Sequence, residues 1–481
     1  MVLSGVAAAE RPHPINRADG SVEVNGKVYA STHAWLTSPE FQAAGGRCGT
    51  PAPQVPLIVV PATGFPDCSD SKTIINPAYN DGRVFVIQVV FHLIQKTDGT
   101  GNITDDQVKS QIQVLNDDYL AAANTHGAPG NNAGIKFVLA RFDPMGNPTN
   151  GIERVTNNSY FSEGDAGTSA MKTALHWDTS RYLNVYSSGL DSVGLLGYAT
   201  FPWDRTTTTS NTAVDGVVLT YQSVGVNSAY TPYDLGASAT HEIGHWFGLY
   251  HPFQGGCAGT GATAYTAGDL ISDTARDSTS HSGCTVTPSD CGDAGLFVPI
   301  ENYMEYTDDS CMTKFSVEQV NRARCGIVHY RNVNTEPTSL FTFTSAALVT
   351  TFTSTSTDTE STAAQLHYNW DFGDGMTGTD QNPVHTYAAA GSYDVTLEVV
   401  DPGSAAATSK QTIVVSATGG NGNGSGSGSG NGNGGGDAGI GGGDGGGGGS
   451  PGGCCSAGGG DLSFLLSGAP IAFVLLRRRR R

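Results

Sequence analysis

The sequence predicts an α+β domain followed by an all-β domain. Between residues 83 and 334, runs of β-branched apolar residues alternate with a few segments of helical spacing, which is typical of a sheet packed by helices. Between residues 337 and 417, Thr- and Ser-rich alternation replaces helical spacing altogether. The chain has 481 residues, which is enough for several domains with buried cores.

Local patterns predict the elements of the α+β domain one by one. The β-branched apolar run at 84–93 predicts a buried strand. A helix is predicted over 104–123, where Thr104 can act as the N-cap. Apolar residues follow it near helical spacing at Val108, Ile112, Leu115 and Leu120. Further strands are predicted at 135–142, 182–186 and 216–221.

Charge argues against two classes of partner. The chain carries 25 Lys and Arg against 44 Asp and Glu, for a formal net charge of −19. So acidic a body lacks the basic face of nucleic-acid-binding proteins and does not favour anionic lipid. Nine cysteines fit an exported protein, because disulfides persist outside the cytosol. No apolar run reaches the length of an ordinary membrane-spanning helix.

Both ends of the chain are predicted to carry targeting information. Residues 1–9 are apolar and end in small residues, and we interpret them as the remnant of a signal peptide that starts upstream. The alternative is an unstructured cytosolic N-terminus. Residues 418–453 are rich in Gly and are predicted to be a flexible linker, and residues 454–481 are predicted to be a sorting tail.

The tail consists of three ordered parts. Cys454 and Cys455 precede a short apolar stretch at 462–476, and Arg477 to Arg481 follow. The stretch is too short for a permanent membrane span, but an apolar segment stopped by Arg suits a transient sorting signal. The arrangement resembles C-terminal tails of the MYXO-CTERM kind, which implies processing at the cysteines and display at the cell surface or release. The alternative is a low-complexity tail without an address.

A complete zinc-binding pattern stands at 241–251. It reads His241-Glu242-Ile243-Gly244-His245-Trp246-Phe247-Gly248-Leu249-Tyr250-His251, or H-E-x-x-H-x-x-G-x-x-H. Residues four apart share a helix face, so His241 and His245 can bind one Zn²⁺. Gly248 can adopt a left-handed conformation that ends the helix and lets His251 arrive as the third ligand. Glu242 faces the fourth position, where it can take a proton from the attacking water.

The pattern is specific. A single histidine is more often a satisfied core residue than a ligand, but five fixed positions arise by chance less than about once in ten thousand. Farther along stands Glu301-Asn302-Tyr303-Met304-Glu305-Tyr306-Thr307-Asp308-Asp309-Ser310-Cys311-Met312. With the zinc motif, this segment resembles the metzincins and specifically the pappalysin family of zinc endopeptidases.

The resemblance implies a fold and roles for two more residues. It implies a metzincin catalytic domain at 83–334, an α+β fold with a mixed twisted sheet and an active-site helix. Met304 is implied as the Met-turn residue that forms an apolar floor beneath the histidines. Tyr306 is implied as the phenol that hydrogen-bonds the tetrahedral oxyanion. Without the zinc helix, a Met and a Tyr would more often be core residues.

Four cysteines and several acids follow the zinc helix. Sequence alone leaves a second zinc site or any of three disulfide connectivities open, and the resemblance implies the pairs Cys257–Cys291 and Cys284–Cys311. The resemblance also implies structural Ca²⁺ in this stretch, with Asp273 and Thr274 as the best match. Solvated surface acids are the alternative for Asp269, Asp273, Asp277, Asp290 and Asp293.

A cysteine ahead of the α+β domain predicts a control mechanism. Cys48 lies in Gly45-Gly46-Arg47-Cys48-Gly49-Thr50-Pro51, which resembles the cysteine switch of metzincin zymogens. Residues 10–82 are then a pro-segment, and a Cys48 thiolate in the fourth zinc position would keep the enzyme latent until cleavage. The alternative is a disulfide between Cys48 and Cys68.

The all-β region at 337–417 resembles the PKD (polycystic-kidney-disease-type) repeat, an Ig-like β-sandwich. The resemblance rests on Asn369-Trp370-Asp371-Phe372-Gly373-Asp374-Gly375 and on the segments at 383–387 and 391–397. Trp370 and Phe372 are predicted to point inward, and Asp371 and Asp374 to accept hydrogen bonds in the turn. We interpret the module as a spacer.

Two hypotheses from different classes follow. The first is a secreted or surface-displayed zinc endopeptidase, made as a latent zymogen, that hydrolyses proteins or peptides and meets the membrane only through its tail. The second is an inert surface adhesion protein on a protease scaffold. The presence of Glu242 and Tyr306 favours the first. Several pappalysin-like enzymes cut beside basic residues, but net charge alone defines no specificity pocket.

Overall fold

The protein is described here by a computed structural model. It describes residues 15–16, 22–24, 27–29, 47–48, 50, 79, 81–161, 170–190, 195–203, 213–265, 267–331, 333–418 and 422–424. The predicted signal-peptide remnant and sorting tail, together with most of the pro-segment and of the linker, lie outside these ranges. Within them, no helix combines the length and the hydropathy needed to cross a bilayer.

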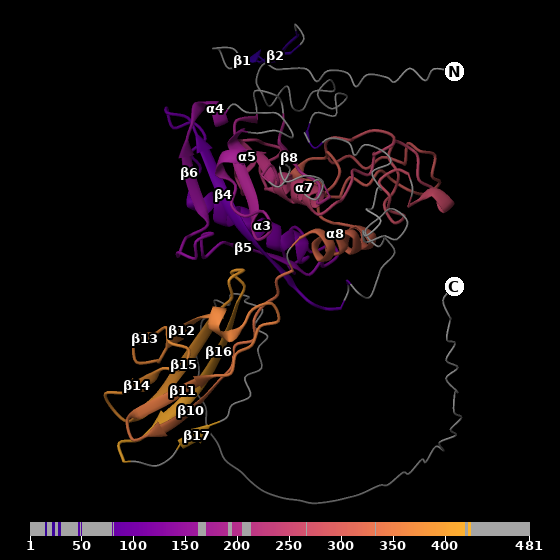
Figure 1. Cartoon of the computed structure of the whole chain (residues 1–481). Helices are drawn as coiled ribbons and strands as arrows, with labels where there is room; N and C mark the ends of the chain where they lie inside the picture. Colours follow the sequence, from indigo (N-terminus) through magenta and orange to yellow (C-terminus); the bar gives the residue numbers. More distant parts are fainter. Residues whose placement is uncertain are drawn as a thin grey trace, which may run out of the picture. The chain divides into compact units, whose positions relative to one another are not determined.

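The α+β domain is built on a six-stranded mixed sheet, which confirms the predicted fold class (Figure 1). The strands lie in the order β5-β4-β7-β9-β8, and β6 pairs with β4. All pairs are parallel except that β8 runs antiparallel to β9 at the edge. The strands are β4 (Phe85–Gln95), β5 (Ile135–Leu139), β6 (Ile152–Thr156), β7 (Leu183–Ser188), β8 (Gly197–Ala199) and β9 (Val217–Thr220).

Helices and short strands complete this part of the chain. The helices are α3 (Asp105–Tyr119), α4 (Asn158–Phe161), α5 (Ala170–Leu175), α7 (Ala237–Trp246) and α8 (Val317–Tyr330), with 3₁₀ helices η5 (Tyr221–Ser223), η6 (Gly261–Thr263) and η7 (Asp309–Cys311). Three short strands near the N-terminus form a separate antiparallel sheet: β1 (Ile15–Asn16), β2 (Val22–Val24) and β3 (Lys27–Tyr29).

The predicted elements are present, and two of them end early. β4 is buried along almost its whole length, as its apolar run predicts. Thr104 caps α3 in a capping box with Gln107, but the helix ends at Tyr119 rather than 123. Ala121 follows with a left-handed φ of 48°, which a continuing helix does not allow. β5 ends at Leu139 rather than 142, because Phe142 turns back to bridge Pro148.

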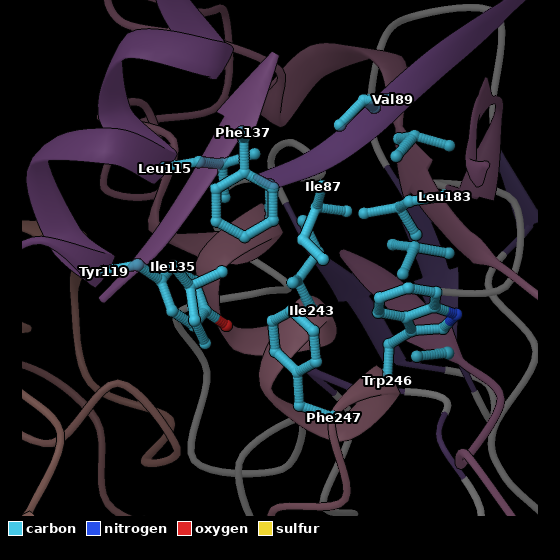
Figure 2. Packing of buried hydrophobic residues seen from close by; sticks show 14 of the residues in the cluster. Ile87, Val89, Leu115, Tyr119, Ile135, Phe137, Leu183, Ile243, Trp246 and Phe247 are labelled. Carbon is cyan, nitrogen blue, oxygen red and sulfur yellow. The ribbon is translucent and has the colours of Figure 1, made fainter. Parts of the chain in front are cut away.

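Helix α7 is packed into the main hydrophobic core. All of its residues are buried. In Figure 2, Ile243 lies next to Ile87 of β4, and Trp246 and Phe247 flank it. From α3, Leu115 and Tyr119 join the same core beside the strand residues Ile135 and Phe137. The helix that carries the zinc motif is therefore held rigidly by the sheet.

The second domain is a β-sandwich, as predicted. Two four-stranded sheets have the orders β14-β11-β10-β17 and β13-β12-β15-β16. Trp370 and Phe372 are buried in its core, and Asp371 and Asp374 accept turn hydrogen bonds from Gly373 and Met376. The elements are β10 (Phe341–Ala346), β11 (Val349–Ser354), η8 (Ala363–Gln365), β12 (His367–Asp371), β13 (Thr377–Gly378), β14 (Val384–Thr386), β15 (Gly391–Val400), β16 (Ala406–Val415) and β17 (Gly422–Gly424).

Candidate zinc centre and active site

The three predicted histidines meet at one point. His241 and His245 project from α7, and Gly248 takes a φ of +101° that turns the chain so that His251 faces them. The Nε2 atom of His251 lies 3.2 Å from that of His241 and 3.0 Å from that of His245, and the last two are 3.2 Å apart. All three side chains are buried.

The donor set fits a zinc ion. The Nδ1 atoms of His241 and His245 each lie 2.7 Å from a backbone carbonyl, of Tyr303 and Leu249 respectively. A carbonyl only accepts, so Nδ1 carries the hydrogen and Nε2 presents a lone pair. Burial lowers the pKa of His245 to about 4, and burial and the neighbouring histidines lower the pKa of His241 well below its ordinary value. Converging lone pairs on buried neutral imidazoles are the arrangement that Zn²⁺ binds.

Glu242 lies beside this centre on the same helix. Its side chain is 2% exposed and packs against β8, where a Cβ added to Gly197 would lie 2.6 Å from Glu242 Cγ. Only a glycine leaves room there for the carboxylate. The edge strand and the acid are thus fitted to each other beside the histidine cluster.

The Met-turn segment lies beneath the histidines. Met304 is fully buried, and its Sδ atom would meet a Cβ on Gly244 at 2.4 Å, so the methionine packs closely against α7 between two ligand positions. The ring of Tyr306 lies 5.0 Å from that of His251 and 5.7 Å from that of His241, between ring centroids. The structure therefore brings both residues to the histidine cluster, and the roles that the family resemblance implies for them stay predictions.

Three residues of the N-terminal region also reach this site. Cys48 forms a parallel bridge with Gly197 of β8, and its thiol lies among the three histidines with one ligand atom of each within 4.8 Å. It carries a buried thiol rather than the disulfide that we considered as an alternative. Burial and the Glu242 carboxylate raise the pKa of this thiol well above its ordinary value. The Sγ atom lies 3.3 Å from Glu242 Oε2.

Thr50 and Arg47 hold the same segment on either side of Cys48. The Thr50 hydroxyl donates to Glu242 Oε2 at 3.0 Å and accepts from the Ala199 amide at 2.9 Å. Arg47 is buried, donates to the carbonyl of Thr307 and pairs with Asp309 at 3.4 Å. Neither contact was predicted from the sequence.

Two further acids that the sequence analysis missed fix α7. Asp309 Oδ2 accepts from the amides of Leu235 and Ala237 at the start of α7, at 3.0 and 3.2 Å. Asp118 of α3 accepts 2.6 Å hydrogen bonds from Thr240 Oγ1 and from Tyr303 Oη. Burial raises the pKa of Asp118 to about 6. The spacing of α3 offered one signal for Asp118. It lies three residues after the apolar Leu115, which places it on the buried face of the helix.

A buried ion pair holds the other end of α7. Arg331 pairs with Asp215 at 2.7 Å, and both side chains are almost fully buried. The same carboxylate accepts from Trp246 Nε1, and the Arg331 guanidinium lies 3.7 Å from the centre of the Trp246 ring. Trp246 directly follows His245, so this clamp fixes the helix next to a ligand.

The cysteines after the zinc helix form the two disulfides that the family resemblance implied. Cys257 pairs with Cys291 and Cys284 with Cys311. These four sulfurs are bonded to one another, so they do not form the second zinc site that we considered as an alternative. The described residues between 252 and 315 contain no strand and only the short helices η6 and η7.

The five acids of this region have different surroundings. Thr274 Oγ1 donates to Asp269, whose pKa burial raises to about 7. The Asp273 carboxylate accepts from Ser316 Oγ at 2.5 Å and from the Glu318 amide at 2.9 Å, at the start of α8. Asp293 pairs with Arg276. Asp277 and Asp290 lie with His281 in a group whose ligand atoms are within 4.8 Å of one another.

Comparisons with known proteins agree with this site. The family model for peptidase family M43, described as pregnancy-associated plasma protein-A, matches residues 166–328, and the PKD domain model matches residues 334–416. An extracellular metalloprotease of Pyricularia oryzae is 33% identical over 305 residues, covering 63% of this chain and 94% of the relative. One of Verticillium alfalfae is 37% identical over 249 residues, covering 51% and 76%.

Two solved structures are also similar. Mature mirolysin of Tannerella forsythia in complex with a cleaved peptide is 36% identical, with 50% of this chain and 90% of that chain covered and a TM-score of 0.42. The PKD1 domain of the Vibrio cholerae metalloprotease PrtV is 36% identical, with 17% and 98% covered and a TM-score of 0.16.

Fold, histidine cluster and relatives define the class of the protein, which is a metalloprotease. Within that class, the chain belongs to peptidase family M43, the family of pregnancy-associated plasma protein-A, and it carries a PKD domain after the catalytic domain.

Proposed function

We propose that this protein is a secreted zinc endopeptidase of the pappalysin type, made as a latent precursor. The observation that carries the proposal is the convergence of three buried histidine Nε2 atoms within 3.2 Å of one another beside a glutamate. Relatives described as extracellular metalloproteases support secretion. The predicted sorting tail would display the enzyme at the cell surface before processing.

The catalytic roles follow from the side chains around the histidines. A zinc ion held by His241, His245 and His251 would supply Lewis-acid activation of water and of the scissile carbonyl. Glu242 would accept the proton of the attacking water and return it to the leaving amine. Tyr306 would donate its phenol hydrogen to the developing oxyanion, while Met304 supports the ligands from below.

Latency would come from three contacts at once. Cys48 lies at the fourth corner of the histidine cluster, and a cation there favours its thiolate form. Thr50 engages the carboxylate oxygen that has to accept the water proton. The segment also pairs with the free edge of β8, where an extended substrate would add a strand. Cleavage between Cys48 and Arg83 would release all three contacts.

The position of Arg47 supports a preference for basic substrates. Its guanidinium is buried against Asp309, the Thr307 carbonyl and the ring of Tyr233. Removal of the N-terminal segment would vacate the space of the Arg47 side chain and leave the buried Asp309 carboxylate facing it. An Arg or Lys side chain of a substrate has the charge to fill it.

Structural calcium remains a prediction for the region after the zinc helix. Asp269 together with Thr274 supports it better than Asp273 with Thr274, because Asp273 is engaged with the start of α8. The prediction is checked by melting the protein with and without a calcium chelator that leaves zinc bound.

The proposed activity is tested by hydrolysis of casein with the processed protein. We expect activity that a zinc chelator abolishes and that added zinc restores. Glu242→Gln should lower kcat by roughly 10³-fold with zinc content unchanged, because a general base is lost while the ligands stay. Equal activity of Glu242→Gln and the unchanged protein would refute the catalytic role of Glu242. Absence of activity in both would favour the hypothesis of an inert adhesion protein.

A second experiment tests latency. Cys48→Ala in the precursor should produce activity before processing, and Cys48→Ala combined with Thr50→Val should produce more, because Glu242 is then also released. A precursor that stays silent with both substitutions would refute the latency mechanism.

A further inference from the structure

We propose that Phe253 is a positioning residue of the catalytic centre, whose ring holds Tyr306 against His251. The inference rests on the proposed function, because it assigns to Tyr306 the oxyanion-binding role. Phe253 lies outside the main hydrophobic core.

The backbone after His251 places this ring. The Gln254 amide donates to the His251 carbonyl at 2.9 Å, and the Gly256 amide donates to the Phe253 carbonyl at 3.0 Å. These are two successive turns, and Gly255 and Gly256 have φ values of +71° and +63°, which favour glycine. The chain therefore folds back directly after the third histidine.

As a result, Phe253 lies flat on the third histidine. The ring centroids of Phe253 and His251 are 4.7 Å apart and the planes differ by 10°. Stacking of this kind restricts rotation of the imidazole about its own axis. The Phe253 side chain is only partly buried, so its contacts are not explained by packing of the domain interior.

Tyr306 lies in the corner formed by these two rings. Its ring meets Phe253 at 4.9 Å and 69°, and His251 at 5.0 Å and 78°. Both are edge-to-face arrangements. Each favours the contacting orientation of the two rings over a separated one by roughly two- to tenfold. The Tyr306 amide donates to the Glu305 carboxylate at 2.6 Å, which fixes the backbone at this position.

Without Phe253, one wall of this corner would be missing. Tyr306 stands on an irregular loop, so the phenol could then rotate away from the histidine cluster. Because the oxyanion exists only in the transition state, the loss should appear in kcat and not in KM.

A double-mutant cycle with Tyr306 tests the proposal on the full-length processed enzyme and a peptide substrate. Tyr306→Phe should lower kcat by about 10²-fold. Phe253→Ala should lower kcat by roughly tenfold, with KM within about twofold of the parent. In the Tyr306→Phe background, Phe253→Ala should cost less than about twofold, because no phenol hydroxyl remains to be positioned. Phe253→Tyr, which keeps the ring, should recover most of the loss.

Phe201 provides the matched control. Its ring lies edge-to-face on another ligand, His245, at 5.6 Å and 73°. The rings described as meeting Tyr306 are those of His241, His251 and Phe253. Phe201→Ala and Tyr306→Phe should therefore multiply their effects on kcat, in contrast to the Phe253 cycle.

Three outcomes would overturn the proposal. Multiplicative effects of Phe253→Ala and Tyr306→Phe would mean that the two residues act independently. Loss of zinc in Phe253→Ala would mean that the ring acts through the ligand, and a raised KM at unchanged kcat would make it a wall of the substrate cleft. In each case the parent enzyme remains active; a parent without chelator-sensitive hydrolysis would instead refute the proposed function.

Discussion

The two parts of the catalytic domain on either side of His251 are held together in different ways. The described residues between 84 and 251 form the mixed sheet with its helices, which enclose a main apolar core and smaller apolar clusters. The described residues between 252 and 315 contain two short 3₁₀ helices and are tied by two disulfides and by polar contacts; near the end of this part, Tyr303, Met304, Met312 and Phe315 join the main core. The histidines come from the first part and its end, whereas Met304 and Tyr306 come from the second.

The two halves of the site are therefore stabilised by different interactions. A segment that cannot bury enough apolar surface needs covalent or polar links to keep one conformation. The ligand helix depends on packing and on buried polar clamps at both ends. Changes in the first part should therefore unfold the domain, and changes in the second should loosen it locally.

The largest effect is expected at the clamp of α7. Arg331→Met should lower the free energy of unfolding by about 3 to 5 kcal/mol, because it leaves the buried Asp215 carboxylate without its cation. Urea unfolding followed by circular dichroism measures this. Arg276→Met is the matched control in the second part, where the ion pair with Asp293 is partly exposed and should contribute about 1 kcal/mol or less. Equal costs would remove the distinction between the two parts.

A slightly smaller and more local effect is expected from a disulfide. Cys284 and Cys311 are 27 residues apart, so their link should stabilise by about 3 to 4 kcal/mol through loop closure. In the variant with both replaced by Ser, hydrogen exchange should accelerate between 252 and 315 while β4 and α3 keep their protection. Faster exchange in β4 would show that the two parts unfold as one unit.

The smallest effect is a pH dependence at the seam between the parts. The pKa of Asp118 is raised to about 6, so the folded state binds this proton more tightly than the unfolded state does. Below pH 4, this difference in pKa contributes roughly 2 to 3 kcal/mol to the free energy of unfolding. The contribution is lost as the pH rises to about 6. Asp118→Asn should remove that slope from urea midpoints measured between pH 4 and 7. Thr240→Val should move it to higher pH, because the Thr240 hydrogen bond lowers this pKa.

The sequence predicted what local patterns encode. Periodicity located β4 and α3, and motif spacing located the histidines that the structure brings together. The Arg-Cys-Gly setting of Cys48 predicted that its thiol lies at the histidines, and the family resemblance implied the disulfide pairs. Periodicity missed the ends of α3 and β5, since a left-handed residue and a bridging turn decide them.

Long-range polar contacts were beyond prediction. Arg47 meets Asp309 across 262 positions, and Asp118 meets Tyr303 across 185. No spacing rule links residues so far apart. The placement of Asp273 was unpredictable for the same reason. Only the folded chain shows that its carboxylate accepts hydrogen bonds at the start of α8.

One carboxylate connects the N-terminal segment to the ligand helix. Asp309 offers Oδ1 to Arg47 and Oδ2 to the amides of Leu235 and Ala237. If activation removes the segment as proposed, the electron distribution of that carboxylate would change with the loss of the guanidinium, and the chemical environment of the two amides would change with it. Their proton chemical shifts are therefore built-in reporters that would allow maturation to be followed residue by residue in a magnetic resonance spectrum.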